Sequence, residues 1–139
     1  AALTGQALPD SAGEDSYSLI PLFQQQPGYQ RTATVHHSIE GEFAIRQGDW
    51  KLALCPGSGG WSSPSPFDEG TDSLPPFQLY NLAEDPGEQH NLIEQHPETA
   101  DSLRNLLTQY IKQGRSTTGP PQPNDGEYPW KQLNWITTD

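Results

Sequence analysis

The sequence has 139 residues, with 7 Lys and Arg against 18 Asp and Glu, so its formal net charge is −11. This length suits one domain, or part of a larger one, of the usual size of about 100–200 residues. The strong acidity argues against nucleic acid and anionic membrane surfaces as partners, because both are bound through clustered Lys and Arg. No apolar run approaches the roughly 20 residues that cross a bilayer, so we expect no membrane span.

The composition also indicates what kind of chain this is. It contains 13 Gly and 14 Pro, which predicts a domain rich in loops. The single cysteine, Cys55, excludes an internal disulfide and a cysteine-based zinc cluster. The sequence begins with Ala1 and contains no Met, so we expect a processed chain or, in preference, a fragment of a longer protein.

The first 30 residues carry weak structural signals, and we interpret residues 1–30 as a lead-in to the main unit. An apolar cluster at residues 15–23 follows Asp and Ser side chains that can cap a helix, which predicts a short helical turn. The segment that follows, at residues 24–28, ends in Pro-Gly and predicts a break.

From residue 31 the pattern becomes typical of β-strands. Residues 32–39 are rich in β-branched side chains that alternate with polar ones, which predicts a strand. Residues 43–46 and 50–54 each carry apolar side chains at every second position, and residues 47–49 between them predict a tight hairpin turn. A further strand is expected at residues 77–82.

A long loop and one helix complete the main unit. Residues 55–76 consist mostly of Gly, Ser and Pro, which is typical of a functional or partner-covered loop. The helix is expected to begin with Pro97 and to end at Gly114. Its apolar stripe comprises Leu103, Leu106, Leu107, Tyr110 and Ile111. We therefore predict an α+β fold, with a small antiparallel sheet packed against one amphipathic helix and with long irregular loops.

The composition changes again after Gly114. Residues 115–139 carry four prolines and no apolar periodicity, which predicts an irregular tail that docks on a surface. Its anchors would be Trp130, Leu133, Trp135 and Ile136. The sequence thus divides into the lead-in at 1–30, the main unit at 31–114 and the tail at 115–139.

Cys55 precedes a glycine-rich stretch, residues 56–60, that could mark a nucleophile or a phosphate loop. The stretch lacks the Lys-Ser or Lys-Thr pair of a P-loop and the strand-to-helix context of a dinucleotide loop. No neighbour in the sequence supplies a cation or a base that would activate the thiol. We interpret Cys55 as a structural thiol at the end of a strand.

Two adjacent histidines, His36 and His37, lie in the first predicted strand. Successive side chains of a strand point to opposite faces, so one regular strand cannot direct both rings to one metal. His37 shares its face with Val35 and Ile39, which favours packing at the sheet edge, whereas His36 shares a polar face open to solvent or substrate. The acids at residues 84–88 lack the spacing of an EF-hand and suit turn chemistry instead. Asp85 can bond backbone N–H groups of this turn, and Asn91 can do likewise ahead of Leu92. The residues alone therefore predict no catalytic site and no metal site.

The segments at residues 14–22, 43–52 and 79–92 together resemble segments of one enzyme family, the formylglycine-dependent, arylsulfatase-like sulfatases. Residues 43–52 read FAIRQGDWKL and resemble the family's hairpin FAIRxGxWKL, and residues 79–92 read LYNLAEDPGEQHNL and resemble its segment LYNLxxDPxExxNL. Residues 14–22 are similar to the DGxSLLP piece that precedes the family's C-terminal subdomain. The order and spacing agree, and the resemblance covers roughly residues 14–115.

The resemblance implies an architecture and a reaction. Such sulfatases have an alkaline-phosphatase-like catalytic domain, followed by a C-terminal subdomain with a four-stranded antiparallel sheet and a helix. A hydrated formylglycine beside a calcium ion hydrolyses the sulfate ester, and both belong to the N-terminal domain. The formylglycine motif requires Pro or Ala two residues after Cys and Arg four residues after, where Cys55 is followed by Gly57 and Gly59. The chain thus resembles the C-terminal part of a sulfatase, with no catalytic residue and no cofactor of its own.

The resemblance also implies partners for this chain. It would pack against the N-terminal catalytic domain of the same protein and shape the pocket for a sulfated small molecule or saccharide, an aryl or carbohydrate sulfate. His36 and His37 are the candidate substrate-binding residues, and Trp61 is a candidate on the pocket rim. Arg115 is expected to be structural. A periplasmic or secreted location is expected from the family.

Two other interpretations remain open. One is a free-standing carbohydrate-binding or interaction module that uses Trp61, Trp130 and Trp135. The other is the same subdomain of a related phosphatase or phosphonate hydrolase. A fragment of an enzyme should expose an apolar face toward its missing domain, whereas a binding module should be self-contained and present a row of exposed aromatic side chains.

Overall fold

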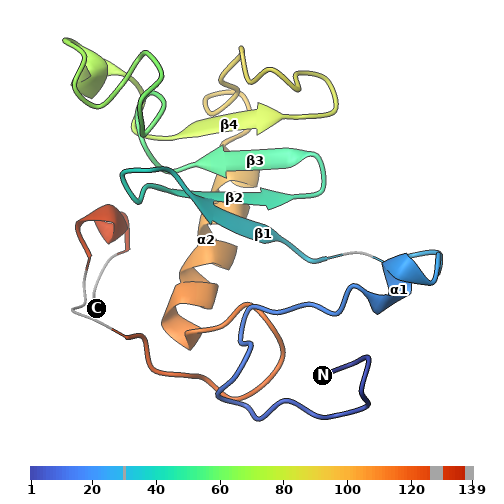
Figure 1. Ribbon diagram of the computed structural model, residues 1–139. Helices are drawn as coiled ribbons and strands as arrows, with labels where there is room; N and C mark the ends of the chain where they lie inside the picture. Colours follow the sequence, from blue (N-terminus) through green and yellow to red (C-terminus); the bar gives the residue numbers. More distant parts are fainter. Residues whose placement is uncertain (30, 126–129, 137–139) are drawn as a thin grey trace. The chain divides into compact units, whose positions relative to one another are not determined.

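The structure is a computed structural model that describes residues 1–29, 31–125 and 130–136. Its contacts divide the chain into two compact units (Figure 1). The terminal unit comprises Ala1–Arg31 with Thr108–Tyr128, and the sheet unit comprises Thr32–Leu107 with Pro129–Asp139. None of the helices in the described part is long and apolar enough to cross a membrane.

A four-stranded antiparallel sheet forms the centre of the sheet unit, with the strands in the order β1-β2-β3-β4. The strands are β1 (Thr34–His37), β2 (Phe43–Gln47), β3 (Trp50–Ala53) and β4 (Gln78–Asn81). The main helix, α2, spans Pro97–Gln113. This arrangement confirms the predicted α+β fold.

The hairpin between β2 and β3 is as tight as its sequence predicts. Gln47 pairs with Trp50, which leaves only Gly48 and Asp49 in the turn. Gly48 adopts a φ of 58°, the positive value that two-residue hairpin turns require and that glycine adopts without steric cost.

One face of the sheet is apolar and is covered by α2 (Figure 1). A row of paired residues, Val35, Ile45, Leu52 and Leu79, runs across all four strands on this face. Ile45, Leu52 and Leu79 are fully buried. On the helix, Ala100, Leu103 and Leu107 are buried. Burying each of these larger side chains contributes about 1.5–3 kcal/mol, so this face holds the sheet and the helix together.

The first strand is shorter than the sequence predicts. It ends at His37 instead of Ile39, because Ser38 begins a turn. The Ser38 hydroxyl accepts a hydrogen bond from the Glu42 backbone N–H at 3.1 Å, and the Gly41 N–H donates to the Ser38 carbonyl. Ile39 therefore leaves the strand and is 62% exposed.

The loop at residues 55–76 has an internal order of its own. Asp68 accepts hydrogen bonds from the Ser63 hydroxyl and from the backbone N–H and hydroxyl of Ser65. The buried hydroxyl of Thr71 donates to the Ser65 carbonyl at 2.7 Å, and Thr71–Ser73 forms a short 3-10 helix, η1.

Apart from α1 (Ile20–Phe23), the predicted helical turn, and the C-terminal end of α2, the terminal unit is irregular. Arg115 is buried in it and donates to the carbonyls of Asp10, Thr117 and Pro120. The Tyr17 hydroxyl donates to the Ser116 carbonyl at 2.9 Å. Arg115 thus joins two ends of the unit, which supports the structural role expected for it.

The end of the tail docks on the sheet unit itself. Lys131–Leu133 forms a second 3-10 helix, η2, and Leu133 and Ile136 are buried. The Gln132 side chain donates to the Glu40 carbonyl at 2.9 Å. Trp130 stacks on Phe43 with ring centroids 6.4 Å apart. Four anchors therefore hold residues 130–136 beside the turn between β1 and β2.

Candidate functional site

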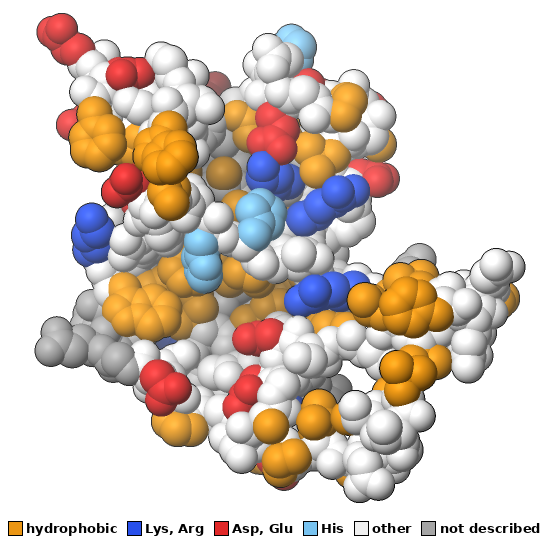
Figure 2. All heavy atoms as spheres, viewed as in Figure 1, with side chains coloured by type: hydrophobic (Ala, Val, Ile, Leu, Met, Phe, Trp, Pro, Cys, Tyr) orange, Lys and Arg blue, Asp and Glu red, His pale blue; other side chains and the backbone are white. Residues whose placement is uncertain are grey.

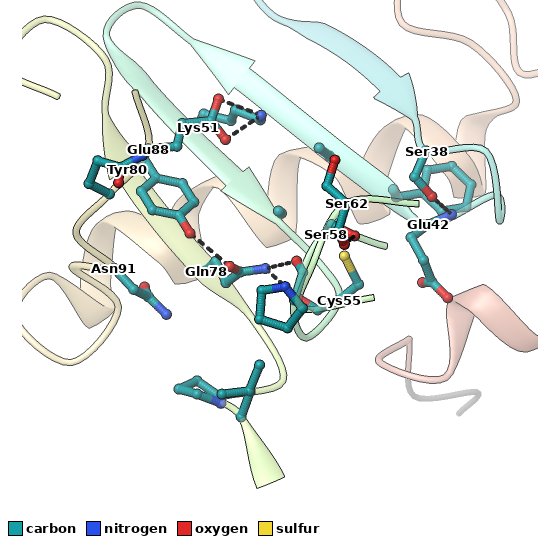
Figure 3. Close-up of a pocket in the computed structure, with 18 of the residues that line it drawn as sticks. Ser38, Glu42, Lys51, Cys55, Ser58, Ser62, Gln78, Tyr80, Glu88 and Asn91 are labelled. Carbon is teal, nitrogen blue, oxygen red and sulfur yellow. Dashed lines mark hydrogen bonds and ion pairs between the residues drawn. The ribbon is translucent and has the colours of Figure 1, made fainter. Parts of the chain in front are cut away.

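The face of the sheet opposite α2 forms the floor of a groove of about 940 Å³, which Figure 3 shows in close-up. A second row of paired residues, His36, Ala44, Ala53 and Gln78, lies on this face, and all four line the groove. The loop at residues 55–76 supplies one wall, and residues 86–89 with Asn91 supply another. Every lining residue belongs to the sheet unit.

Gln78 fixes the loop wall to the sheet (Figure 3). Its amide nitrogen donates to the carbonyls of Cys55 at 2.8 Å and Gly57 at 2.6 Å. Its amide oxygen accepts from the Tyr80 hydroxyl at 2.7 Å. Gly57 has a φ of 60°, and a Cβ at this position would collide with the Pro64 carbonyl oxygen. The wall therefore depends on a glycine at this position.

The second wall begins with an ion pair. The Lys51 ammonium lies 2.6 and 2.7 Å from the two carboxylate oxygens of Glu88, and both side chains are partly buried. Lys51 comes from β3, whereas Glu88 comes from the turn 37 residues later. The pair ties this turn to the sheet.

Two polar side chains shape the same turn. The Asp85 carboxylate accepts from the backbone N–H groups of Gln89 and His90 at 2.7 and 2.8 Å, and the pKa of Asp85 is lowered mainly by the bond from His90. The Asn91 side chain accepts from the N–H groups of Leu79 and Ile93, both at 3.0 Å. The turn chemistry predicted for Asp85 and Asn91 is confirmed, and it builds the groove wall.

The two candidate histidines lie on opposite faces of β1, as predicted. His36 lies in the floor row of the groove. Desolvation, and after it the positive charge of Lys51, lowers the pKa of His36, and the carboxylate of Glu88 acts in the other direction. The His37 ring packs edge-on against Phe43, with centroids 4.3 Å apart, although His37 also contributes atoms to the lining. Both rings are exposed, and their contact with a substrate stays a prediction.

Trp61 lies on the loop wall with 82% of its surface exposed. It does not line the groove, but Ser58 and Ser62 on either side of it do. Its place on a rim stays a prediction.

Several groove residues were not identified by the sequence analysis: Glu42, Lys51, Gln78, Tyr80 and Glu88. Lys51, Gln78 and Tyr80 alternate along their strands with the apolar residues Trp50, Leu52 and Leu79, and this pattern could have indicated the polar face. Nothing in the sequence pairs Glu88 with Lys51, because the contact depends on the path of the turn.

Cys55 lies at one end of the groove and is buried. Desolvation, together with the nearby Glu42 carboxylate, raises the pKa of the Cys55 thiol to about 11. The thiolate is the nucleophilic form of cysteine, so Cys55 is unreactive near neutral pH. The described residues also contain no group of three or more His, Cys, Asp or Glu side chains that could hold a metal ion.

Comparison with protein families and with curated proteins gave no match. Among solved structures, the chain is similar to a Bacteroides thetaiotaomicron sulfatase described in work on the metabolism of multiple glycosaminoglycans by a versatile core genetic locus. The sequence identity is 29% and the TM-score is 0.60. The match covers 78% of this chain and 22% of the sulfatase. This likeness confirms the resemblance of the chain to a sulfatase C-terminal subdomain.

Proposed function

We propose that this chain is the C-terminal part of a sulfatase that hydrolyses sulfate esters, and that it packs on the catalytic domain and shapes the substrate pocket. The groove on the face of the sheet opposite α2 supports this proposal. It is a cavity lined by hydrogen-bonding groups, and it is formed by the segments that resemble the family. The catalytic domain would supply formylglycine and calcium. His36, His37 and Trp61 would contact the substrate.

The exposed apolar surface supports an enzyme fragment. On α1 and beside it, Leu19 and Leu22 are each 50% exposed and Phe23 is 75% exposed. Figure 2 shows hydrophobic side chains gathered over α1. Burying such a surface is favourable, and the proposed catalytic domain is the partner that would cover it.

A free-standing carbohydrate-binding module is less well supported. Its three tryptophans should form an exposed row, but only Trp61 is fully exposed. Trp130 stacks on Phe43, and the Trp135 indole N–H donates to the Gln132 carbonyl at 3.0 Å. Two of the three rings therefore help to anchor the tail.

The solved relative favours a carbohydrate sulfate over an aryl sulfate as the substrate. That sulfatase is described in the context of glycosaminoglycan metabolism, so we propose a sulfated saccharide for this chain as well. A phosphatase or phosphonate hydrolase of the same superfamily would act on a phosphate or phosphonate ester in place of a sulfate ester. Hydrolysis of matched sulfate and phosphate esters distinguishes these enzymes from a sulfatase.

The test is hydrolysis of 4-nitrophenyl sulfate, 4-nitrophenyl phosphate and sulfated hexosamines by the chain alone and by the longer protein to which it belongs. We expect the longer protein to release sulfate and the chain alone to be inactive. In the longer protein, His36→Ala should raise KM more than it lowers kcat, and His90→Ala, which changes an exposed histidine outside the groove, serves as the control. Preferential release of phosphate, or turnover by the chain alone, would contradict the proposal.

A further inference from the structure

The groove is nearly neutral in charge and well supplied with hydrogen-bonding groups. We propose that it binds an uncharged sugar unit next to the sulfated one, and that it rejects a neighbouring unit that carries a carboxylate or a second sulfate. This inference rests on the proposed function, because it concerns the substrate of the same groove.

The charges of the groove come from few side chains. The positive charge of Lys51 is neutralised by Glu88, with which it forms a close ion pair. Glu42 adds one carboxylate at the other end of the groove (Figure 3). His36, with its lowered pKa, is neutral at pH 7, so the fixed charges sum to about one negative charge.

Two further cations, Arg46 and Lys131, lie outside the lining of the groove. Arg46 neighbours Lys51 in the register, yet it does not line the groove, and its side chain donates to the Gly48 carbonyl at 3.0 Å. Two charges outside the lining, the Lys131 ammonium and the Glu40 carboxylate, act on Glu42 in opposite directions. A carboxylate or sulfate that entered the groove would therefore meet Glu42 with no cation in the lining other than Lys51, which is paired with Glu88, and like charges repel at this range.

The groups that remain available suit hydroxyls. Glu42, His36 and Ser62 line the groove and have side-chain polar atoms that form no hydrogen bond within the described part of the chain. In contrast, the Tyr80 hydroxyl is bonded to Gln78, and the Gln78 amide is bonded to the loop. A carboxylate only accepts hydrogen bonds, while a neutral imidazole donates one and accepts one. Sugar hydroxyls do both, so they match this set.

An aryl group would match the groove poorly. It would cover the Glu42 carboxylate and the His36 nitrogens without offering a partner, and unpaired buried polar groups are costly. Desolvation already raises the pKa of Glu42, which shows that this carboxylate has lost part of its water. The volume of about 940 Å³ lies at the upper end of the range for small-molecule sites, about 300–1,000 Å³, so a whole sugar ring has room.

The experiment compares two matched substrates in the longer protein. The first is a disaccharide of a sulfated hexosamine and a uronic acid, with the sulfate at O4 or O6. The second is the same disaccharide after reduction of the uronic carboxyl to an alcohol. We expect kcat/KM to be about tenfold higher for the reduced form, mainly through a lower KM.

Two variants locate the effect. Glu42→Gln keeps the shape of the side chain and removes its charge, so the preference for the reduced form should fall severalfold. Glu69→Gln makes the same change on an exposed residue of the loop that does not line the groove, so the preference should persist.

The outcomes separate the inference from the proposed function. Equal rates, or a preference for the uronic acid form, would overturn the inference alone. Activity on 4-nitrophenyl sulfate without activity on either disaccharide would overturn both the inference and the proposed saccharide substrate. Loss of the preference in Glu69→Gln as well as in Glu42→Gln would also overturn it, because the groove charge would not be its source. Failure to release sulfate from any of these esters would overturn the proposed function itself.

Discussion

The two faces of the sheet differ in how they are built. The face under α2 consists of apolar side chains from the strands and the helix, and Ile45, Leu52 and Leu79 of its central row are fully buried. The opposite face carries the adjacent row, which includes His36 and Gln78, and it is completed by two loops and an ion pair. Residues one step apart along the same strands thus build the core on one face and, on the other, the groove for which we propose a role in recognition.

The two faces are specified by different features of the sequence. The apolar face follows from a repeat of two along each strand and from one helical stripe, which are local properties of the sequence. The groove depends on the conformation of the loops and on contacts between residues far apart, such as Lys51 with Glu88. A substitution should therefore act differently according to the face it affects.

The largest effect is expected on the covered face. Leu52→Ala removes a fully buried side chain from the centre of the row and should lower the free energy of unfolding by about 2–5 kcal/mol. Its neighbour Ala53 lies on the groove face, and Ala53→Ser should change it by less than about 0.5 kcal/mol. Urea denaturation of both variants measures the contrast, and similar losses would contradict the assignment of the two faces.

The sequence predicted much of the covered face. The four strands and the helix were expected at their observed places, with ends that differ by a few residues. The main difference is at Ile39, which was expected in the first strand because of its alternation with Val35 and His37. The hydrogen bonds of Ser38 end the strand before Ile39, and such a side-chain interaction overrides the alternation.

The sequence predicted less of the groove. His36 was placed on an open polar face, and the turn roles of Asp85 and Asn91 were expected from their residue types. Glu42, Gln78 and Glu88 were not, because their roles depend on partners that only the folded chain brings together. The tail was expected to dock on a surface. Its hydrogen bond to Glu40 joins residues that are 92 positions apart in the sequence, and no local pattern indicates such a contact.

A second prediction tests the loop wall of the groove. Gly57→Ala forces a left-handed φ of 60° on alanine and places its Cβ against Pro64, so the free energy of unfolding should fall by about 2–4 kcal/mol. Gly48→Ala introduces the same φ strain, at 58°, in open space, and should cost about 1–2 kcal/mol.

Hydrogen exchange identifies the part of the chain that responds. In Gly57→Ala we expect faster exchange in residues 55–76, and in Gly48→Ala only at the hairpin turn. Equal losses of stability in the two variants would mean that the close approach to Pro64 does not hold the wall in place.

The smallest effect concerns the protonation of His36 on the groove floor. Lys51 lowers the pKa of His36 and Glu88 raises it, so Lys51→Gln should raise this pKa by removing the cation and releasing the carboxylate. Arg46→Gln, on the same face, is the control and should leave it nearly unchanged. The NMR titration of the His36 ring, assigned with His36→Ala, measures both.

The lowered pKa of His36 also predicts how the stability of the fold depends on pH. The pKa of His36 in the fold lies below its usual value of 6.5. As the pH falls below about 6.5, the unfolded chain therefore binds more protons than the folded chain, and the fold loses stability. Lys51→Gln should weaken this acid-dependent loss and His36→Ala should remove it. A His36 pKa at or above its usual value in the unaltered protein would contradict both the direction of the shift and the neutral groove floor on which uncharged sugar recognition depends.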